Sequence, residues 1–259
     1  MDDTGGDVVA ARHARILELA RGTGSVSVEE LATELGVTPQ TIRKDLNALA
    51  GRSMLSRVHG GAIVTSGVDN ISYTERRAVA TGAKAAIGRA AAALIPNGAS
   101  LFVNIGTTTE AVAIQLTGHR DLLVISNNLN IVDILDGHET IELVVVGGRV
   151  RRGDRAVVGP LAMDFIRTFK VDYALIGASA LDSDGSLLDF SVDEVQVTQT
   201  IVRNAREVIL VADASKVGRP APVRIGRLDM VNYLVMDRLL DPSLRAACTE
   251  HGVRVIETG

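Results

Sequence analysis

The stretch Ser100 to Val112, SLFVNIGTTTEAV, decides the fold of the larger part of this chain. Its apolar run stops at Gly106 and gives way to Thr107, Thr108 and Thr109, which predicts a strand, a tight turn and a helix. Such a turn directs backbone N–H groups, threonine hydroxyls and the positive end of the helix at one point. This pattern is typical of an anion pocket, most often for phosphate, and the alternative is a hydroxyl-rich N-cap that serves only the helix.

Downstream of this stretch, short apolar strands alternate with helical segments. Strands are expected at 122–125, 142–146, 173–176, 208–211, 233–236 and 253–256, and helices at 84–94, 130–135, 161–169 and 192–204. This alternation predicts an α/β domain over 83–259, with a mostly parallel sheet covered on both faces. Ligands of such sheets bind beyond the carboxyl ends of the strands.

Polar side chains cluster at several of these strand ends, and each also has an interpretation as a turn former or a solvated charge. Asparagine can bind hydroxyl groups, lysine can neutralise a phosphate, and carboxylates can accept hydrogen bonds from a polyol. Together with Gly106 to Thr109 they predict a site for a small phosphorylated polyhydroxy compound. The residues are Asn127, Asn128, Asp189, Glu194 and Lys216.

Composition excludes several other classes of protein. The single Cys248 rules out a disulfide framework, and the five histidines lack metal-ligand spacing, so we expect no metal site and no cofactor. There is no G-x-G-x-x-G motif for a dinucleotide. No apolar run reaches the roughly 18 residues of a membrane span, and the N-terminus is acidic, so a cytoplasmic protein without membrane contact is expected.

Residues 1–65 predict a smaller, helical domain. A first helix is expected over 8–21, and a second opens at Ser27 with Glu30 as its capping-box partner and ends at Gly36. Thr38 and Pro39 start a third helix that runs to about residue 50. Two short helices joined by a Gly-Val turn have the dimensions of a helix-turn-helix, whose second helix enters the DNA major groove. Residues 66–82 have little apolar periodicity and predict a linker, with a helix at its end as the alternative.

The third helix, PQTIRKDLNAL, is expected to bury Ile42, Leu46 and Leu49 and to present its polar side chains to a DNA groove. The alternative is a solvated charged face. The following MLSRVHGGAIV, from Met54 to Val64, predicts a hairpin wing that could contact the DNA backbone. The candidate DNA-binding residues are Thr38, Gln40, Thr41, Arg43, Lys44, Arg57 and His59.

The segments VSVEELATELGVTPQTIRKDLNAL and RVHGGA resemble the N-terminal domain of DeoR-family bacterial transcriptional regulators. The resemblance continues through GTTTEAVA, SNNLNI, VVVGGRVR, VGPLAMDF, DSDGSLLDF and VADASKVGR, and so covers nearly the whole chain. It implies a winged helix-turn-helix followed by a larger α/β sensor domain similar in fold to sugar-phosphate isomerases. Two departures are Asn104, where the family often has Asp, and the neutral pair Thr198 and Gln199, where a basic residue is common.

The resemblance implies a repressor, not an enzyme, that binds operator DNA and controls genes of carbon catabolism. Its effector would be a phosphorylated polyol or sugar that lowers operator affinity, with glycerol-3-phosphate favoured. Residues Gly106 to Thr109 would hold the phosphate, and Lys216 and the two asparagines would complete the site. A homo-oligomer is expected because paired DNA half-sites need symmetric partners. The alternative is an enzyme similar to sugar-phosphate isomerases that carries a DNA-binding domain.

Overall fold

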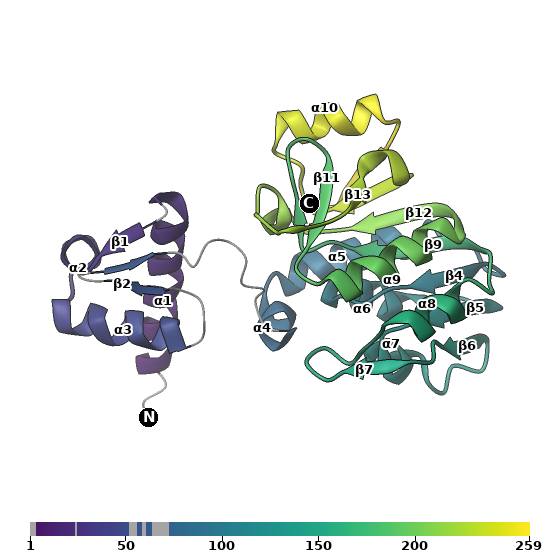
Figure 1. The fold of residues 1–259 in the computed structure, drawn as a ribbon, viewed down its shortest axis with the longest axis horizontal. Helices are drawn as coiled ribbons and strands as arrows, with labels where there is room; N and C mark the ends of the chain where they lie inside the picture. The colour runs from purple at the N-terminus through teal and green to yellow at the C-terminus, as the bar shows by residue number, and fades with distance from the viewer. Residues whose placement is uncertain (1–3, 24, 52–55, 59–60, 64–72) are drawn as a thin grey trace. The chain divides into compact units, whose positions relative to one another are not determined.

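The computed structural model describes residues 4–23, 25–51, 56–58, 61–63 and 73–259 (Figure 1). The chain forms two compact units, Met1–Ile71 and Ser72–Gly259. Among the described helices, none is long and apolar enough to cross a membrane.

The first unit combines three helices with a small sheet. Its elements are α1 (Thr4–Thr23), β1 (Ser25–Ser27), α2 (Val28–Leu35), α3 (Pro39–Gly51), β2 (Ser56–Val58) and β3 (Gly61–Ile63). The three strands are antiparallel in the order β1-β3-β2. The predicted helices and hairpin are therefore present, and β1 adds a third strand that was not predicted because a three-residue strand has no readable periodicity.

The boundaries of α2 and α3 follow from local chemistry. The Ser27 hydroxyl accepts a hydrogen bond from the backbone N of Glu30 at 3.1 Å, which confirms the predicted N-cap. Gly36 ends α2 with φ +64°, a left-handed conformation that glycine adopts without strain. The Thr38 hydroxyl then accepts from the backbone N of Thr41 at 3.2 Å and opens α3. Side chains from α1, α2 and α3 form one core, namely Ile16, Leu17, Ala20, Val28, Leu31, Ala32, Ile42, Leu46 and Leu49.

The second unit is built on a seven-stranded parallel sheet in the order β15-β14-β12-β9-β4-β5-β6. The strands are β4 (Ser100–Val103), β5 (Leu122–Ser126), β6 (Ile141–Val145), β9 (Val171–Gly177), β12 (Ala205–Val211), β14 (Tyr233–Met236) and β15 (Arg254–Glu257). This confirms the predicted parallel sheet. The strand ends shift by up to three residues from the predicted ones because flanking polar residues still pair in the sheet.

Helices cover both faces of this sheet (Figure 1). One core joins the sheet to α5 (Thr81–Ala92), α6 (Thr107–Leu116) and α7 (Leu129–Leu135), and the other joins it to α8 (Pro160–Ile166), α9 (Val192–Arg203) and α10 (Pro242–Glu250). Alternation along β4 shows the division, because Leu101 and Val103 belong to the first core and Phe102 belongs to the second.

Several small elements lie outside the predicted alternation. They are α4 (Tyr73–Ala78), β7 (Arg149–Arg151), β8 (Ala156–Val158), β10 (Ala180–Leu181), β11 (Ser186–Asp189), β13 (Val223–Arg227) and the 3-10 turns η1 (Ala214–Lys216) and η2 (Leu228–Met230). Strands β7 and β8 form an antiparallel hairpin, and β10, β11 and β13 form an antiparallel sheet. Most of these elements line or border the candidate site.

Close packing of α5 on α6 fixes the position of the helix that begins within the threonine loop, the name we give to Gly106 to Thr109. A Cβ atom added at Gly88 of α5 would lie 2.5 Å from the Ala111 carbonyl oxygen of α6, which is far below van der Waals contact. The backbones therefore approach one another at a point where only glycine fits. A Cβ atom added at Gly82, in the first turn of the same helix, would have no neighbouring atom within 4 Å.

We therefore predict opposite effects of the same substitution in α5. Gly88→Ala should lower the free energy of unfolding by about 1–3 kcal/mol because the helices must separate. Gly82→Ala should be neutral or raise it by up to about 1 kcal/mol, since alanine is the better helix former. Urea unfolding of both variants measures the difference, and equal stability would contradict the close contact.

Candidate effector pocket and DNA-binding helix

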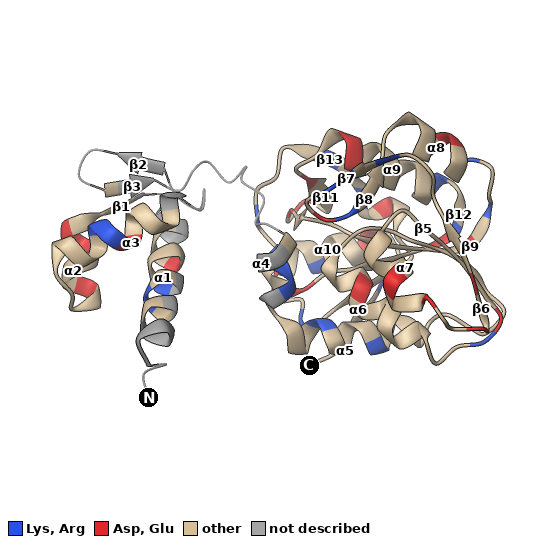
Figure 2. Cartoon of the chain, turned by 90° about the horizontal axis from the view of Figure 1, so that it is seen from below, with Lys and Arg blue, Asp and Glu red and all other residues tan. Residues whose placement is uncertain are grey.

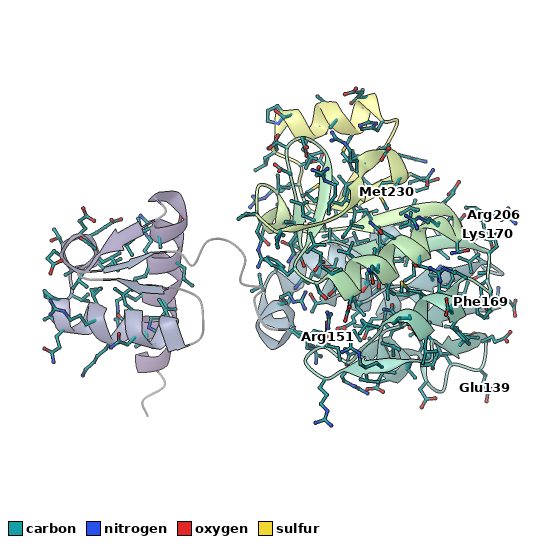
Figure 3. All side chains as sticks on the ribbon, in the orientation of Figure 1. Glu139, Arg151, Phe169, Lys170, Arg206 and Met230 are labelled. Carbon is teal, nitrogen blue, oxygen red and sulfur yellow. The ribbon has the colours of Figure 1, made fainter. Side chains whose placement is uncertain are left out.

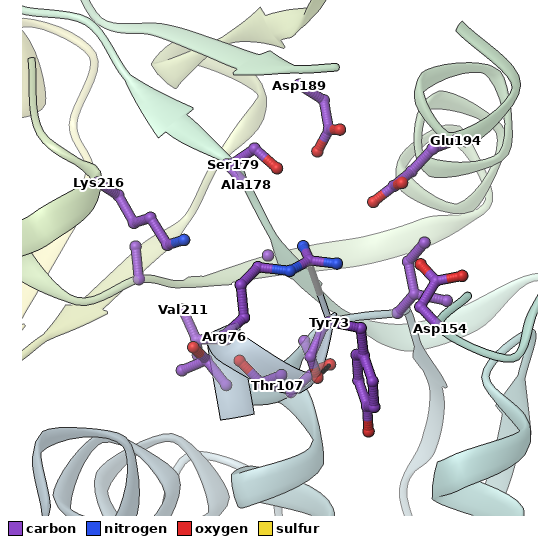
Figure 4. Close-up of a pocket in the computed structure, with 16 residues that line it drawn as sticks. Tyr73, Arg76, Thr107, Asp154, Ala178, Ser179, Asp189, Glu194, Val211 and Lys216 are labelled. Atoms are coloured by element: carbon purple, nitrogen blue, oxygen red, sulfur yellow. Dashed lines mark hydrogen bonds between the residues drawn. The ribbon is translucent and has the colours of Figure 1, made fainter. Parts of the chain in front are cut away.

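A pocket opens beyond the carboxyl ends of three adjacent strands, β12, β9 and β4 (Figure 4). Val211 ends β12, Gly177 ends β9, and Gly106 to Thr109 follow β4. The other walls come from α4, from the β7–β8 hairpin, from the end of β11, from the first turn of α9 and from η1. This is the edge at which the parallel sheet was expected to bind its ligand.

The threonine loop lines the pocket, and its three hydroxyls differ in role: one stabilises the loop and two belong to threonines that are available to a ligand. The Thr109 hydroxyl faces the carbonyl oxygens of Asn104 at 2.8 Å and Gly106 at 2.7 Å, so it donates to the loop itself. Gly106 precedes α6 with φ +142°, a conformation that disfavours other residues. Thr107 and Thr108 also line the pocket. Their hydroxyls and the N-terminus of α6 make a combination that suits an anion.

Lys216 of η1 supplies a cation to the same pocket. Burial lowers the pKa of Lys216 to about 8, although Asp213 opposes this shift, so the side chain is mostly charged at neutral pH. Within the described chain, its ammonium group has neither a hydrogen bond nor an ion pair. A partly buried cation beside a helix N-terminus is suited to an anionic ligand.

Carboxylates line the opposite side of the pocket. Asp189 is 3 % exposed and accepts a hydrogen bond from the backbone N of Phe190 at 2.6 Å. Glu194 accepts from Arg151 at 2.6 Å, and Arg151 also donates to Asp154 at 2.9 Å. Burial and the nearby Asp189 carboxylate raise the pKa of Glu194 to about 7, against the opposing effect of Arg151. Asp189, Glu194 and Asp154 can therefore accept hydrogen bonds from ligand hydroxyls.

Asn127 and Asn128, predicted to bind effector, do not line this pocket. The Asn127 amide donates to the Val157 carbonyl at 3.1 Å and so fastens β5 to the β7–β8 hairpin. The Asn128 side chain caps α7 and donates to Glu110 at 3.0 Å. The strand end did lie at the predicted edge, but the sequence could not show that these amides turn toward the backbone and toward Glu110.

Two pocket residues come from a segment that was predicted to be linker. Tyr73 and Arg76 belong to α4, and both line the pocket beside Thr107 (Figure 4). The Tyr73 hydroxyl donates to Glu110 at 2.8 Å. Burial and this carboxylate raise the pKa of Tyr73, which keeps the hydroxyl protonated. The arginine pair in this segment was the only available sequence signal, and α4 is too short for a periodic pattern.

The two departures from the family pattern are in contact with each other. The Asn104 amide donates to the Thr198 hydroxyl at 2.8 Å, and both residues are buried. Thr198 in turn donates to the Glu194 carbonyl at 2.9 Å. A neutral hydrogen-bonded pair therefore stands beneath the pocket where the family often has charged residues, and it connects β4 to α9.

Helix α3 of the first unit presents its polar residues as expected. Gln40, Arg43 and Lys44 are exposed and Thr41 is half-buried. The lysine and arginine positions of this helix are blue in Figure 2. The side chain of Arg43 lies 3.7 Å from Glu29 of α2, an exposed pair of little strength. The exposed Thr38 uses its hydroxyl as the cap described above. Arg57 is placed in β2 but its side chain is not described, and His59 lies outside the described residues.

Asp45 of α3 binds two side chains of α1 and so fixes how α3 packs on α1. The sequence did not indicate this role of Asp45. It is 5 % exposed and accepts from Arg12 of α1 at 2.6 Å and from His13 at 3.1 Å. Burial alone would raise the pKa of Asp45, but the hydrogen bonds from Arg12 and His13 outweigh it and hold the pKa below its usual value.

Comparison with known protein families bears on both units. A family described as the DeoR-like helix-turn-helix domain matches residues 12–68, and one described as the DeoR C-terminal sensor domain matches residues 79–238. The chain belongs to the DeoR family. It is a transcriptional repressor of that family with a DNA-binding helix-turn-helix domain.

Relatives in this family match over most of their length. The chain is 41 % identical over 244 residues to the glycerol-3-phosphate regulon repressor of Escherichia coli (strain K12), covering 94 % of this chain and 97 % of the relative. It is 45 % identical over 223 residues to the glycerol-3-phosphate regulon repressor of Haemophilus influenzae, covering 86 % and 87 %. It is 36 % identical over 245 residues to the transcriptional repressor CsqR of E. coli, covering 95 % and 94 %.

Solved structures with a similar arrangement are more distant. Ribose 5-phosphate isomerase A from Methanocaldococcus jannaschii aligns with a TM-score of 0.39 and 17 % identity, covering 52 % of this chain and 54 % of the isomerase. The eIF2B beta subunit from Chaetomium thermophilum aligns with a TM-score of 0.47 and 16 % identity, covering 66 % and 54 %.

Glu194 predicts a pH dependence of stability for this DeoR protein. Its pKa is about 7 when folded against 4.5 for the free side chain, so between these values the folded state holds more protons than the unfolded state. The free energy of unfolding should therefore fall as pH rises from 4.5 to 7, by roughly 1–3 kcal/mol from this residue. Glu194→Gln should flatten the decline, as measured by urea unfolding across this range.

The control for this prediction is Glu139→Gln, an exposed glutamate far from Arg151 (Figure 3). It should keep the slope of the unsubstituted protein. Because Glu194→Gln also weakens the contact with Arg151, the slope is compared and not the absolute stability. Parallel curves for all three proteins would show that Glu194 titrates normally.

Proposed function

We propose that this repressor binds operator DNA through α3 and that a phosphorylated polyol or sugar, glycerol-3-phosphate first among them, binds the sensor pocket and lowers operator affinity. The observation that carries the proposal is the pocket at the strand ends, which places the α6 N-terminus and Lys216 opposite buried carboxylates. One side suits a phosphate, and the other suits hydroxyl groups. The names of the relatives favour glycerol-3-phosphate among such compounds.

Release of DNA requires that the effector bind the DNA-free state more tightly than the DNA-competent state. We propose further that the repressor acts as a homo-oligomer, because operators with paired half-sites need symmetric partners. Exposed apolar side chains on the second unit, which contains the sensor domain, support self-association. Leu161 at the start of α8 is 72 % exposed, and Val192 at the start of α9 is 57 % exposed.

An enzyme similar to sugar-phosphate isomerases is the second candidate, and one observation favours it. Glu194 faces the pocket with a pKa near 7, which is the range a general base requires. Its contact with Arg151 counts against this role because it holds the carboxylate in an ion pair. Incubation of the purified protein with pentose and hexose phosphates separates the two functions, since an enzyme would interconvert them and a sensor would return them unchanged.

Thermal unfolding with a panel of metabolites tests the effector class. We expect glycerol-3-phosphate to raise the unfolding temperature and unphosphorylated glycerol to leave it unchanged, because a ligand at about 100 times its Kd adds about 2.7 kcal/mol. Thr108→Val should weaken this stabilisation by removing a pocket hydroxyl, whereas Thr117→Val, at the other end of α6, should not.

The panel also contains fructose phosphates and deoxyribose-5-phosphate. A shift with one of these sugar phosphates alone would keep the effector class and change the identity of the effector. An equal shift with glycerol and glycerol-3-phosphate would contradict a phosphate site, as would a Thr108→Val variant that responds like the unsubstituted protein.

Arg43 tests the assignment of α3 to DNA. Arg43→Ala should weaken operator binding by about tenfold or more, because an arginine in the major groove contributes about 1–3 kcal/mol. Affinity for the effector should stay unchanged, since Arg43 lies in the first unit. Fluorescence anisotropy with a DNA fragment selected by the purified protein gives the first quantity, and calorimetry gives the second.

The matched control is Arg15→Ala, which removes an exposed arginine of α1 that pairs with Glu18 and Glu34. It should bind DNA within about twofold of the unsubstituted protein, because the contact is exposed and weak. If Arg43→Ala loses effector and DNA affinity together, the assignment of the two activities to separate units is wrong.

A further inference from the structure

Arg76 of α4 occupies a position that the proposed function does not yet explain. Its side chain extends from α4 into the middle of the pocket, above Thr107 and between Lys216 and Glu194 (Figure 4). Its Nε atom is buried and has no hydrogen-bond partner among the described residues. A buried, unpaired N–H of a guanidinium group is costly, and an oxygen atom of a bound ligand would satisfy it.

The surroundings of Arg76 indicate the charge of that ligand. Arg76 and Lys216 are both cations, both line the pocket, and within the described chain neither forms an ion pair with a carboxylate. Arg76 also lies close enough to lower the pKa of Lys216. Two cations held near one helix N-terminus repel one another until an anion lies between them.

The nearby carboxylates do not fill this role. Glu194, which also attracts Arg76, and Asp154 are already paired with Arg151. Asp189 accepts from the backbone of Phe190. Asp213, which attracts Lys216, accepts from the backbone N of Ser215 at 3.0 Å and forms no ion pair with the lysine. The flat guanidinium presents N–H groups in a fork that matches two oxygens of one phosphate. A phosphate at the α6 N-terminus would contact this fork, the Lys216 ammonium and the threonine loop.

Helix α4 is held to the sensor domain by two further contacts that do not depend on the Arg76 side chain. The Tyr73 hydroxyl binds Glu110 at 2.8 Å, and the buried Lys84 of α5 donates to the backbone carbonyl of Arg76. In the sequence, α4 is the described element of the sensor unit that lies nearest to the DNA-binding unit. A ligand held by Arg76 would therefore contact the described helix that lies nearest in sequence to the DNA-binding unit.

We propose that Arg76 binds the phosphate of the effector and that this contact links occupancy of the pocket to the position of α4, and so to release of DNA. The inference rests on the proposed function, because it assigns a residue and a route to the same site. It adds a residue that binds the effector and that comes from a helix outside the sheet and the helices that cover it.

Calorimetry on the full chain tests this assignment with glycerol-3-phosphate and with inorganic phosphate as ligands. Arg76→Ala should raise the Kd for both by about tenfold to a hundredfold, as expected for loss of a charge-assisted hydrogen bond. The control is Arg77→Ala, which removes the neighbouring exposed arginine that stacks on Tyr73 and does not line the pocket. It should change the Kd by less than about threefold.

Operator binding in the presence of effector tests the link to DNA. At an effector concentration about 100 times the Kd of each variant, the unsubstituted protein and Arg77→Ala should leave the DNA, and Arg76→Ala should remain bound. Arg76→Gln keeps most of the side-chain volume and serves as the second variant if Arg76→Ala unfolds at a lower temperature. It should show the same loss.

The outcomes separate the two proposals. If the unsubstituted protein binds no phosphorylated compound, the proposed function fails. If it binds one and Arg76→Ala binds it equally well, the function stands and Arg76 is not a ligand. If Arg76→Ala binds weakly but releases DNA fully at saturation, the link through α4 is wrong.

Discussion

The turn between β4 and α6 depends on one hydroxyl group. Thr109 bridges the carbonyl oxygens of Asn104 and Gly106, and this fixes the end of a buried strand relative to the start of a helix. The close contact of Gly88 with Ala111 holds the same helix against α5. With α6 locked in this way, its N-terminal N–H groups and the side chains of Thr107 and Thr108 face one fixed point at the strand ends. The other walls of the pocket are arranged around that point.

The walls differ in charge, and the difference is maintained by contacts outside the pocket. Arg151, from the β7–β8 hairpin, allows Glu194 and Asp154 to remain buried side by side, since unpaired carboxylates there would be costly. On the other side, Lys216 forms no ion pair with a described residue, although the nearby Asp213 carboxylate favours its charged form, and it stands nearer the threonine loop (Figure 4). A ligand with an anionic end and a hydroxyl-bearing end matches both walls, and a free sugar or a bare anion would match only one.

Sequence periodicity was sufficient to predict the large elements and the edge of the sheet at which the pocket opens. The parallel sheet, the helix-turn-helix and its Ser27 cap were predicted because each has a repeating pattern or a specific end signal. Short elements outside the alternation of apolar strands and helices have no such pattern, so α4 lay within the predicted linker and β1, β7 and β8 were missed. The partners of individual side chains could not be predicted from the sequence either. Asn128 lies at the predicted sheet edge yet binds Glu110, and Asp45 lies among basic residues yet is buried against Arg12. Both outcomes depend on partners that are distant in the chain.

Release of operator DNA by effector is the central claim, and one titration tests it most directly. A labelled DNA fragment selected by the purified repressor is followed by fluorescence anisotropy while glycerol-3-phosphate or glycerol is added at constant ionic strength. Constant ionic strength matters because salt alone weakens protein–DNA binding. The proposed function predicts that glycerol-3-phosphate releases the DNA and that glycerol has no effect. Unchanged anisotropy with glycerol-3-phosphate, in a protein shown to bind it, would contradict the coupling of the sensor pocket to the DNA-binding helix.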